Sequence, residues 1–188
     1  LLEAECGARH TIVACGEQGC DPHEEGSGPL LEGQPIIIDI FPQSNRSGYF
    51  GDITRTVVKG KAPDRVRQLF EAVQDGQQLA LDQVKAGVDG QHIHQAILDL
   101  FSGKGYKTGE KDGFRQGFFH GTGHGLGLEI HEAPHISART DVLQAGQVVT
   151  IEPGLYYRGL GGVRLEDVVV VEAEGCRNLT SFPIFLEV

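Results

Sequence analysis

Asp39 is the residue that most constrains how this chain can fold, because it lies within an apolar run. The rest of segment 35–41 is almost entirely hydrophobic, which is typical of a buried β-strand. An ionised carboxylate in such a strand costs several kcal/mol unless it is paired with a cation or binds a metal ion. We therefore expect Asp39 to be either a metal ligand or a structural residue hydrogen-bonded at a strand end.

Three further acidic residues lie on or beside strand-like apolar runs. Asp52 stands at the start of one run, Glu152 directly follows another, and Glu166 lies within a third. Each has an ordinary alternative: Asp52 suits a turn, and Glu152 suits an exposed strand end. Glu166 can pair with Arg164, because residues two apart on a strand share one face. Taken singly, none of these three acids requires a metal ion.

A segment rich in histidine and glycine favours the metal interpretation. The twelve residues from His120 to His131 contain four glycines and three histidines, which are His120, His124 and His131. Glycine lets the backbone pass close to another group, which a ligand site needs and an ordinary core does not. A flexible surface loop with incidental histidines fits poorly, because apolar residues run through the same segment.

Five motifs in this order resemble those of a known family. They are Asp39, the string Gly51-Asp52-Ile53-Thr54-Arg55-Thr56, the segment 120–131, the string Ile151-Glu152-Pro153-Gly154-Leu155-Tyr156, and Val163-Arg164-Leu165-Glu166-Asp167. Over essentially the whole chain they resemble the catalytic domain of the Xaa-Pro dipeptidases (prolidases) and Xaa-Pro aminopeptidases. The resemblance implies an α+β chain with the pita-bread (creatinase/aminopeptidase) fold, in which helices cover the outer face of a curved, mostly antiparallel sheet.

The resemblance further implies a centre of two divalent metal ions. Asp39 would bind one ion, Asp52 and Glu166 would bridge both, and His124 and Glu152 would complete the ligands of the second. The ions would neutralise four carboxylates that could not all stay ionised together without them. Oxygen-rich ligation favours Mn²⁺, with Co²⁺ or Zn²⁺ as alternatives. Two ions roughly 3.5–4 Å apart can hold a bridging hydroxide and polarise a carbonyl.

Further residues around this centre would take part in catalysis. His120 and His131 would contact the scissile carbonyl and the residue after it, and either could stabilise the oxyanion. His23 matches an additional active-site histidine, and Arg164 would hold neighbouring groups in place. Glu152 would also carry a proton from the attacking water to the leaving amine.

The implied activity is hydrolysis of the Xaa-Pro bond in dipeptides or at peptide N-termini. One alternative is a methionine-aminopeptidase-like peptidase on the same fold. Another is a non-catalytic binding protein of that fold, which the complete ligand set argues against. The segment Ile40-Phe41-Pro42 and the long spacing from Asp39 to Asp52 depart from typical members. We expect a longer hairpin there that still returns both acids to one place.

Composition limits the partners. The net charge of −10 argues against nucleic acid and anionic membrane, since both need a basic surface. No segment approaches the roughly 20 apolar residues that span a bilayer. A peptide or dipeptide is the expected partner, and the resemblance implies a homodimer of the full-length protein. The cysteine spacing indicates reduced thiols in a cytoplasmic protein, with a Cys15–Cys20 disulfide as the minor alternative.

Periodicity and turn residues predict strands, then two helices, then strands. We expect strands at 12–16, 35–41 and 49–59, a helix from Pro63 to about Lys85, and a second, capped by Asp89, to about Ser102. We expect loops at 17–33 and 103–113 and short strands at 128–131, 147–152, 163–172 and 184–188.

Residues 1–188 are expected to form one catalytic domain that is N-terminally incomplete, because the family has helices before the first strand seen here. Missing cover over the sheet predicts low stability for the isolated chain. Four remaining histidines are expected to have no functional role: His10, His92, His94 and His135. His92 and His94 point to different sides of a helix and cannot bind one ion together.

Overall fold

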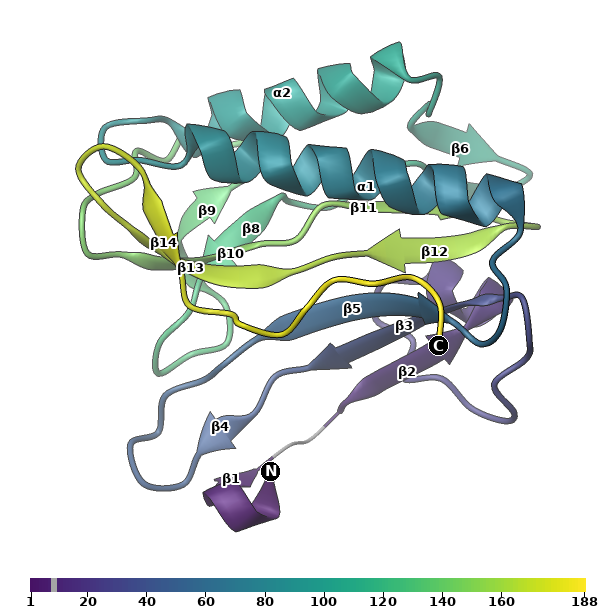
Figure 1. Ribbon diagram of the computed structural model, residues 1–188. Coiled ribbons are helices and arrows are strands. Elements are labelled where there is room, and N and C mark those ends of the chain that lie inside the picture. The colour runs from purple at the N-terminus through teal and green to yellow at the C-terminus, as the bar shows by residue number, and fades with distance from the viewer. Residues whose placement is uncertain (8–9) are drawn as a thin grey trace.

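Two α-helices lie side by side on one face of the strands (Figure 1). The computed structural model describes residues 1–7 and 10–188. Helix α1 spans Asp64–Gln83 and helix α2 spans Gly90–Gly103, and short 3₁₀ helices span Leu2–Ala4 and Gly16–Cys20. In the described part of the chain, neither α-helix is long and apolar enough to cross a membrane.

Both predicted helices are confirmed, with small changes at their ends. Pro63 precedes the first residue of α1 and does not form part of the helix. Asp89 caps α2 as predicted, because its side chain accepts a hydrogen bond of 2.9 Å from the backbone N–H of Gln91. The loop expected at 17–33 begins with the 3₁₀ helix that ends at Cys20.

The strands form a five-stranded sheet of order β14-β13-β10-β8-β9, a three-stranded sheet of order β2-β3-β5, and three two-stranded ribbons. Their pairing is antiparallel. The bounds are β1 Cys6–Gly7, β2 Ile12–Cys15, β3 Pro35–Ile40, β4 Gln43–Ser44, β5 Ile53–Val58, β6 Gly109–Lys111, β7 Phe114–Gln116, β8 Gly123–Gly125, β9 Glu132–Ile136, β10 Val148–Ile151, β11 Gly154–Tyr157, β12 Gly161–Arg164, β13 Asp167–Val171 and β14 Cys176–Asn178.

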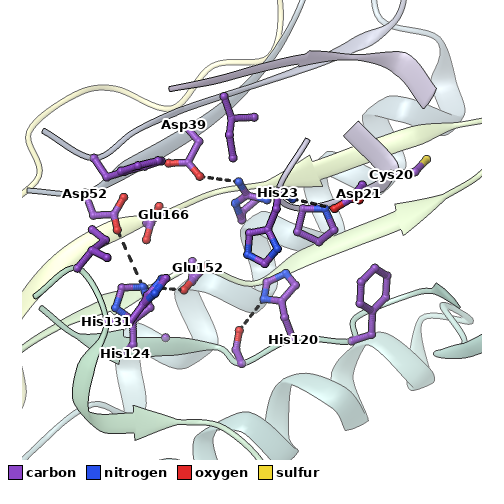
Figure 2. A pocket seen from close by; sticks show the side chains of 18 of the residues that line it. Cys20, Asp21, His23, Asp39, Asp52, His120, His124, His131, Glu152 and Glu166 are labelled. Atoms are coloured by element: carbon purple, nitrogen blue, oxygen red, sulfur yellow. Dashed lines mark hydrogen bonds and ion pairs between the residues drawn. The ribbon is translucent and has the colours of Figure 1, made fainter. Parts of the chain in front are cut away.

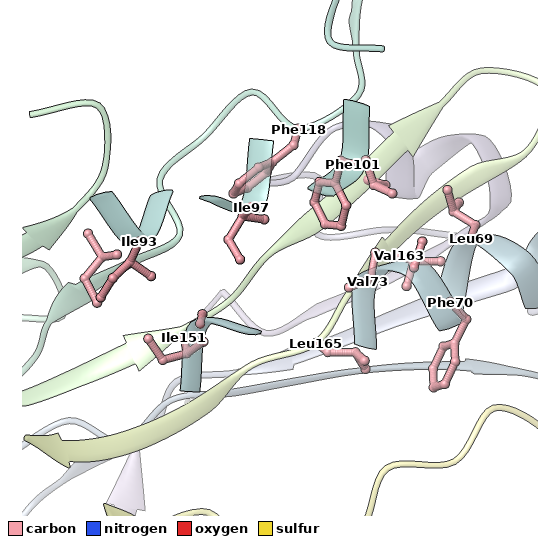
Figure 3. Close-up of a cluster of buried hydrophobic side chains, with 14 of the residues drawn as sticks. Leu69, Phe70, Val73, Ile93, Ile97, Phe101, Phe118, Ile151, Val163 and Leu165 are labelled. Carbon is pink, nitrogen blue, oxygen red and sulfur yellow. The ribbon is translucent and has the colours of Figure 1, made fainter. Parts of the chain in front are cut away.

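The main hydrophobic core lies between the two helices and the strands beneath them (Figure 3). Leu69 and Val73 of α1 and Ile97 of α2 are fully buried there, because helical spacing places apolar residues along one stripe of each helix. Ile151 at the end of β10 packs into the same core. The core therefore fixes the end of β10, and the residue after it is Glu152.

The predicted strand at 128–131 is wrong. That segment forms bends, and strands β8 and β9 lie on either side of it. Strand β8 consists of Gly123, His124 and Gly125, a composition that disfavours a strand. A Cβ on Gly123 would lie 1.9 Å from the carbonyl oxygen of Thr150 in β10. Close contact between the two strands therefore requires glycine, and this tertiary requirement overrides local propensity.

Other predicted strands have different limits in the structure. The run 163–172 divides into β12 and β13, and the predicted strand 49–59 begins only at Ile53. The expected loop 103–113 contains β6, which pairs with β7, and β11 was not predicted. Residues 184–188 are hydrogen-bonded beside β5 without forming a strand: the Val58 N–H donates to the Leu186 carbonyl at 2.6 Å.

Arg55 ties this C-terminal segment to the sheets. Its buried guanidinium donates to Asp167 Oδ1 and to the carbonyl of Phe182, both at 2.7 Å, and to the carbonyl of Glu166 at 2.6 Å. Arg55 thus joins the segment after β14 to the short link between β12 and β13.

The four cysteines are free thiols.

Candidate active site

The predicted site residues converge on one open cavity of about 1100 Å³ between the two larger sheets. Figure 2 shows the acids and histidines pointing into it from several strands. Asp39 comes from β3, Asp52 precedes β5, His124 lies on β8, Glu152 follows β10, and Glu166 lies between β12 and β13. All nine residues assigned a role from the sequence line this cavity.

Three of the predicted ligands have donor atoms close enough to share one cation. An atom of Asp52, one of His124 and one of Glu166 lie within 4.8 Å of one another. His124 Nε2 lies 3.9 Å from Asp52 Oδ2 and 3.2 Å from Glu152 Oε1. The other ring nitrogen, Nδ1, lies 3.1 Å from the Gly125 carbonyl, so that nitrogen carries the proton. Nε2 is therefore the nitrogen available to a metal ion.

Asp39 has one satisfied and one unsatisfied oxygen. Its Oδ2 accepts a 2.6 Å hydrogen bond from Arg164 Nη2, whereas its buried Oδ1 has no hydrogen-bond partner in the structure. Buried carboxylate oxygens are rarely left without a partner, because the cost is high. A metal ion bound to Oδ1 would satisfy this oxygen.

Crowding of the acids also indicates a need for cations. Burial raises the pKa of Asp52 to about 8, and the nearby Asp39 and Glu152 carboxylates add to the effect. Burial, reinforced first by Asp52, raises the pKa of Glu166 well above its usual range. Burial likewise raises the pKa of Asp39 against the opposing charge of Arg164. Positive charge supplied by a cation would favour the ionised form of each of these acids, so the residues fit a metal centre.

Glu152 differs from the other acids of the cluster. Burial disfavours its ionised form, but the hydrogen bond from His124 and the positive charges around it prevail and lower its pKa to about 2. The same pair raises the pKa of His124 against the effect of burial. Glu152 is therefore an ionised carboxylate directly beside His124 Nε2.

His120 and Arg164 are connected by a residue that the sequence did not reveal. Tyr156, which is fully buried, places its hydroxyl 2.8 Å from His120 Nε2 and 3.0 Å from Arg164 Nη1. His120 Nδ1 lies 2.8 Å from the Gly121 carbonyl and carries the proton, so Nε2 accepts from the tyrosine hydroxyl. Burial lowers the pKa of His120 to about 4, so its ring is neutral.

His131 and His23 face the open side of the cavity. The ring of His131 stands edge-on to that of His124, with centroids 4.3 Å apart, and burial lowers its pKa. Both residues are exposed in the structure, and His23 lies across the cavity from His131 (Figure 2). Both are thus placed to meet a ligand that enters the cavity.

Thr54 is a second residue that the sequence analysis did not single out. Its hydroxyl donates to Glu166 Oε2 at 2.7 Å and accepts from Arg164 Nε at 3.3 Å. It lies within the string 51–56 on β5, where it pairs with Asp39 of β3. The available signal was its position two residues after Asp52 in a strand-like run, because alternate residues of a strand face the same side of the sheet.

The remaining histidines take no part in the cation-binding cluster. His94 is buried and its Nδ1 lies 2.9 Å from the hydroxyl of Thr122. His10 contacts Glu25, and His135 lies 3.7 Å from Asp141. His10 and His135 do line the outer part of the cavity, a position that their sequence context did not indicate.

The chain is similar to several known proteins. The model of metallopeptidase family M24 matches residues 2–173. The Xaa-Pro dipeptidase of Pyrococcus furiosus is 38% identical over 94% of the chain. Two solved structures superpose closely: an X-Pro aminopeptidase of Thermotoga maritima, with TM-score 0.85 and 37% identity over 97% of the chain, and an Xaa-Pro dipeptidase of Bacillus anthracis, with TM-score 0.86 and 37% identity over 96%. The chain spans 49% of the length of each of these three proteins.

Proposed function

The chain belongs to metallopeptidase family M24, and from this we propose that the protein hydrolyses the Xaa-Pro bond of dipeptides or of peptide N-termini. The expected pita-bread fold is confirmed by the solved structures that superpose on the chain. The observation that carries the proposal is the cluster of Asp52, His124 and Glu166 donor atoms within 4.8 Å. The names of the relatives support a substrate with proline in second position.

We propose that the five predicted ligands hold two divalent ions. Asp52 and Glu166 are candidates to bridge them, Asp39 offers its unpartnered oxygen to one, and His124 Nε2 and Glu152 serve the other. When bound, such ions supply Lewis-acid polarisation of the substrate carbonyl and lower the pKa of water. The absence of a cysteine ligand favours a hard ion, and Mn²⁺ remains our prediction.

Glu152 is the residue placed to move the proton. Its low pKa makes it a carboxylate at neutral pH, and it lies beside the cluster at 3.2 Å from His124. A carboxylate there can accept a proton from water and pass it to the leaving nitrogen. Its contact with His124 keeps it ionised until that transfer occurs.

His131 suits the role of oxyanion donor better than His120 does. Both nitrogens of His120 are engaged, one by the Gly121 carbonyl and the other by the Tyr156 hydroxyl. His131 lies in the cavity with an exposed side chain. We propose that His131 donates to the developing oxyanion, whereas His120 shapes the wall against which the substrate packs.

The test is metal analysis combined with hydrolysis of Xaa-Pro peptides by the full-length protein, before and after addition of Mn²⁺. We expect about two equivalents of metal, consistent with two-ion sites in general. His124→Ala and Asp52→Asn are each expected to remove metal and activity together. His92→Ala, on the exposed surface of α2, is the matched histidine control. Metal content unaffected by either site variant would sink the proposal.

Neither alternative function gains support from a specific feature of the site. Turnover of Met-Ala peptides without turnover of Xaa-Pro substrates would favour the methionine-aminopeptidase-like activity. A cytoplasmic location, a homodimer of the full-length protein, and residues 1–188 as an N-terminally incomplete catalytic domain remain predictions.

A further inference from the structure

Helix α2 carries a buried histidine, His94, on the face that packs into the main core. Its neighbours on that face, Ile93 and Ile97, are fully buried, and His94 itself is 7% exposed. Burial lowers the pKa of His94, so its ring is neutral at pH 7. A buried polar group destabilises a core unless it is hydrogen-bonded, so the partners of His94 account for its presence there.

His94 contacts both ends of segment 118–122. Its Nδ1 lies 2.9 Å from the hydroxyl of Thr122, a fully buried residue, and its ring lies against that of Phe118 with centroids 5.3 Å apart. His120 stands between these two contacts and lines the cavity. The sequence predicted no functional role for His94, because Thr122 is 28 positions away and spacing could not reveal the contact. Helix α2 therefore supports, from the core side, the segment that presents His120 to the cavity.

Phe118 limits where the ring of His120 can lie. The two rings are nearly perpendicular, at 87°, with centroids 5.0 Å apart. Phe101, also on α2, packs against Phe118 with centroids 5.6 Å apart (Figure 3). Aromatic pairs of this geometry are favourable beyond the area that they bury. Two side chains of α2, His94 and Phe101, therefore fix the ring on which His120 rests.

Thr122 connects the same helix to Glu152. Its carbonyl accepts from the backbone N–H of Glu152 at 2.7 Å, and its own N–H donates to the Ile136 carbonyl at 2.7 Å. Glu152 follows the last residue of β10, and Thr122 precedes the first residue of β8. The hydrogen bond between them thus joins the two strands at the point where Glu152 leaves the sheet. The contact of His94 with the Thr122 hydroxyl holds the residue that accepts this bond.

We propose that His94 is a positioning residue, which holds segment 118–122 so that His120 and Glu152 keep their places in the cavity. The inference rests on the proposed peptidase function, because these places matter to catalysis only if a peptide is cleaved there. Displacement of a catalytic group by about 1 Å can lower the rate by about a hundredfold. A side chain in the core can therefore affect turnover without touching the substrate.

Two substitutions in the full-length protein separate the contacts of His94. His94→Phe keeps a buried ring against Phe118 but removes the hydrogen bond to Thr122. His94→Asn loses the ring but places an amide at the position of Nδ1, and an amide can donate to the hydroxyl or accept from it. Val73→Ala, a truncation in the same core on α1, is the matched control for lost stability.

Hydrogen exchange resolved to single amides, in the presence of Mn²⁺, reports on the backbone of Glu152. In His94→Phe the Glu152 amide is expected to exchange about tenfold faster relative to that of Val171, whose N–H donates to the Gln147 carbonyl just before β10. His94→Asn should recover part of this protection. Val73→Ala should accelerate both amides by the same factor.

Hydrolysis of Ala-Pro by the Mn²⁺-loaded proteins supplies the second measurement. His94→Phe is expected to lower kcat about tenfold with KM nearly unchanged, because the support of catalytic groups is lost while the substrate still binds. His94→Asn should recover part of this loss. Each kcat refers to the folded fraction measured by circular dichroism, so Val73→Ala should match the wild type.

Uniform acceleration of exchange in His94→Phe, or a kcat per folded molecule equal to that of the wild type, overturns the positioning role. Failure of His94→Asn to recover either quantity overturns it as well. If the wild-type protein cleaves no Xaa-Pro peptide while His94→Phe selectively exposes the Glu152 amide, the proposed function alone is refuted, and the hold of His94 on the Glu152 backbone is supported.

Discussion

At the residue scale, the acids of the cluster depend on one another for their charge. Asp52, with a pKa of about 8, is largely protonated at pH 7 when no cation is bound, and burial together with the neighbouring acids also raises the pKa of Glu166. Glu152 is ionised under the same conditions. A cation that binds here must therefore displace protons, which links metal affinity to pH.

We predict that metal binding releases at least one proton at pH 7 and weakens as the pH falls below about 8. Below that value Asp52 gains a proton that competes with the ion, so affinity drops by about tenfold per pH unit for each proton displaced. Calorimetry of Mn²⁺ binding in buffers of different ionisation enthalpy measures the protons directly. An apparent enthalpy that is the same in every buffer would contradict the prediction.

Tyr156→Phe is predicted to destabilise the protein by about 1–3 kcal/mol, although it removes only one oxygen. The hydroxyl donates to His120 Nε2 and accepts from Arg164 Nη1, so its loss leaves two buried partners unsatisfied. Urea denaturation of both proteins measures the difference. Tyr157→Phe serves as the control, because its hydroxyl bonds only the more exposed Lys107 carbonyl. Equal losses for the two variants would refute the argument.

Sequence made the ligands easier to identify than the residues that support them. Asp39 stood out because an acid in an apolar run needs an explanation, and His124 stood out among glycines. Tyr156 and Arg55 gave no such signal, because a tyrosine or an arginine in a strand is ordinary until its partners are known. Those partners are distant in sequence, so only the folded chain shows them.

At the scale of elements, strand β8 shows how closely the backbone must pack to place His124. Gly123 and Gly125, which flank His124 in this strand, have no room for a side chain. A Cβ on Gly123 would lie 1.9 Å from the Thr150 carbonyl oxygen, and a Cβ on Gly125 would lie 2.4 Å from the Ala133 carbonyl oxygen. The sequence indicated a close approach here but not a strand. Propensity describes isolated segments, whereas this strand is determined by its neighbours on both sides.

Gly123→Ala is predicted to cost about 3 kcal/mol of stability and to weaken metal binding, because β8 must move away from β10. Gly103→Ala is the matched control, since a Cβ there meets nothing within 4 Å at the end of α2. It is expected to be neutral or to stabilise by about 0.5–1 kcal/mol. Thermal unfolding and Mn²⁺ titration of both variants check this. Similar behaviour of the two would show that space at β8 is not limiting.

At the scale of the whole molecule, Arg55 connects the C-terminal segment to the link that carries Glu166. It forms a buried ion pair with Asp167 at 2.7 Å, and further hydrogen bonds run to the carbonyls of Phe182 and Pro183. The helices and most strands were predictable from periodicity. This connection was not, because 112 residues separate Arg55 from Asp167.

Arg55→Met is predicted to destabilise the protein by about 3 kcal/mol, because it leaves the Asp167 carboxylate buried without its partner. Adding Asp167→Asn should recover part of that loss, since the uncompensated charge is then removed. Urea denaturation of the two single variants and the double variant gives the coupling energy. Strictly additive losses would mean that the two side chains do not act as a pair.

The wide separation of the site residues along the chain has a consequence for how the protein folds. Asp39 and Arg164 are 125 positions apart, and Thr54 and Glu166 are 112 apart. Forming such contacts closes long loops, and the chain loses conformational entropy before the contacts contribute favourable energy. This order of events slows folding. The cation-binding cluster therefore cannot exist in a partly synthesised or partly folded chain. Metal ions held by the proposed ligands would consequently bind only after the topology is complete, and would stabilise the folded molecule by slowing its unfolding.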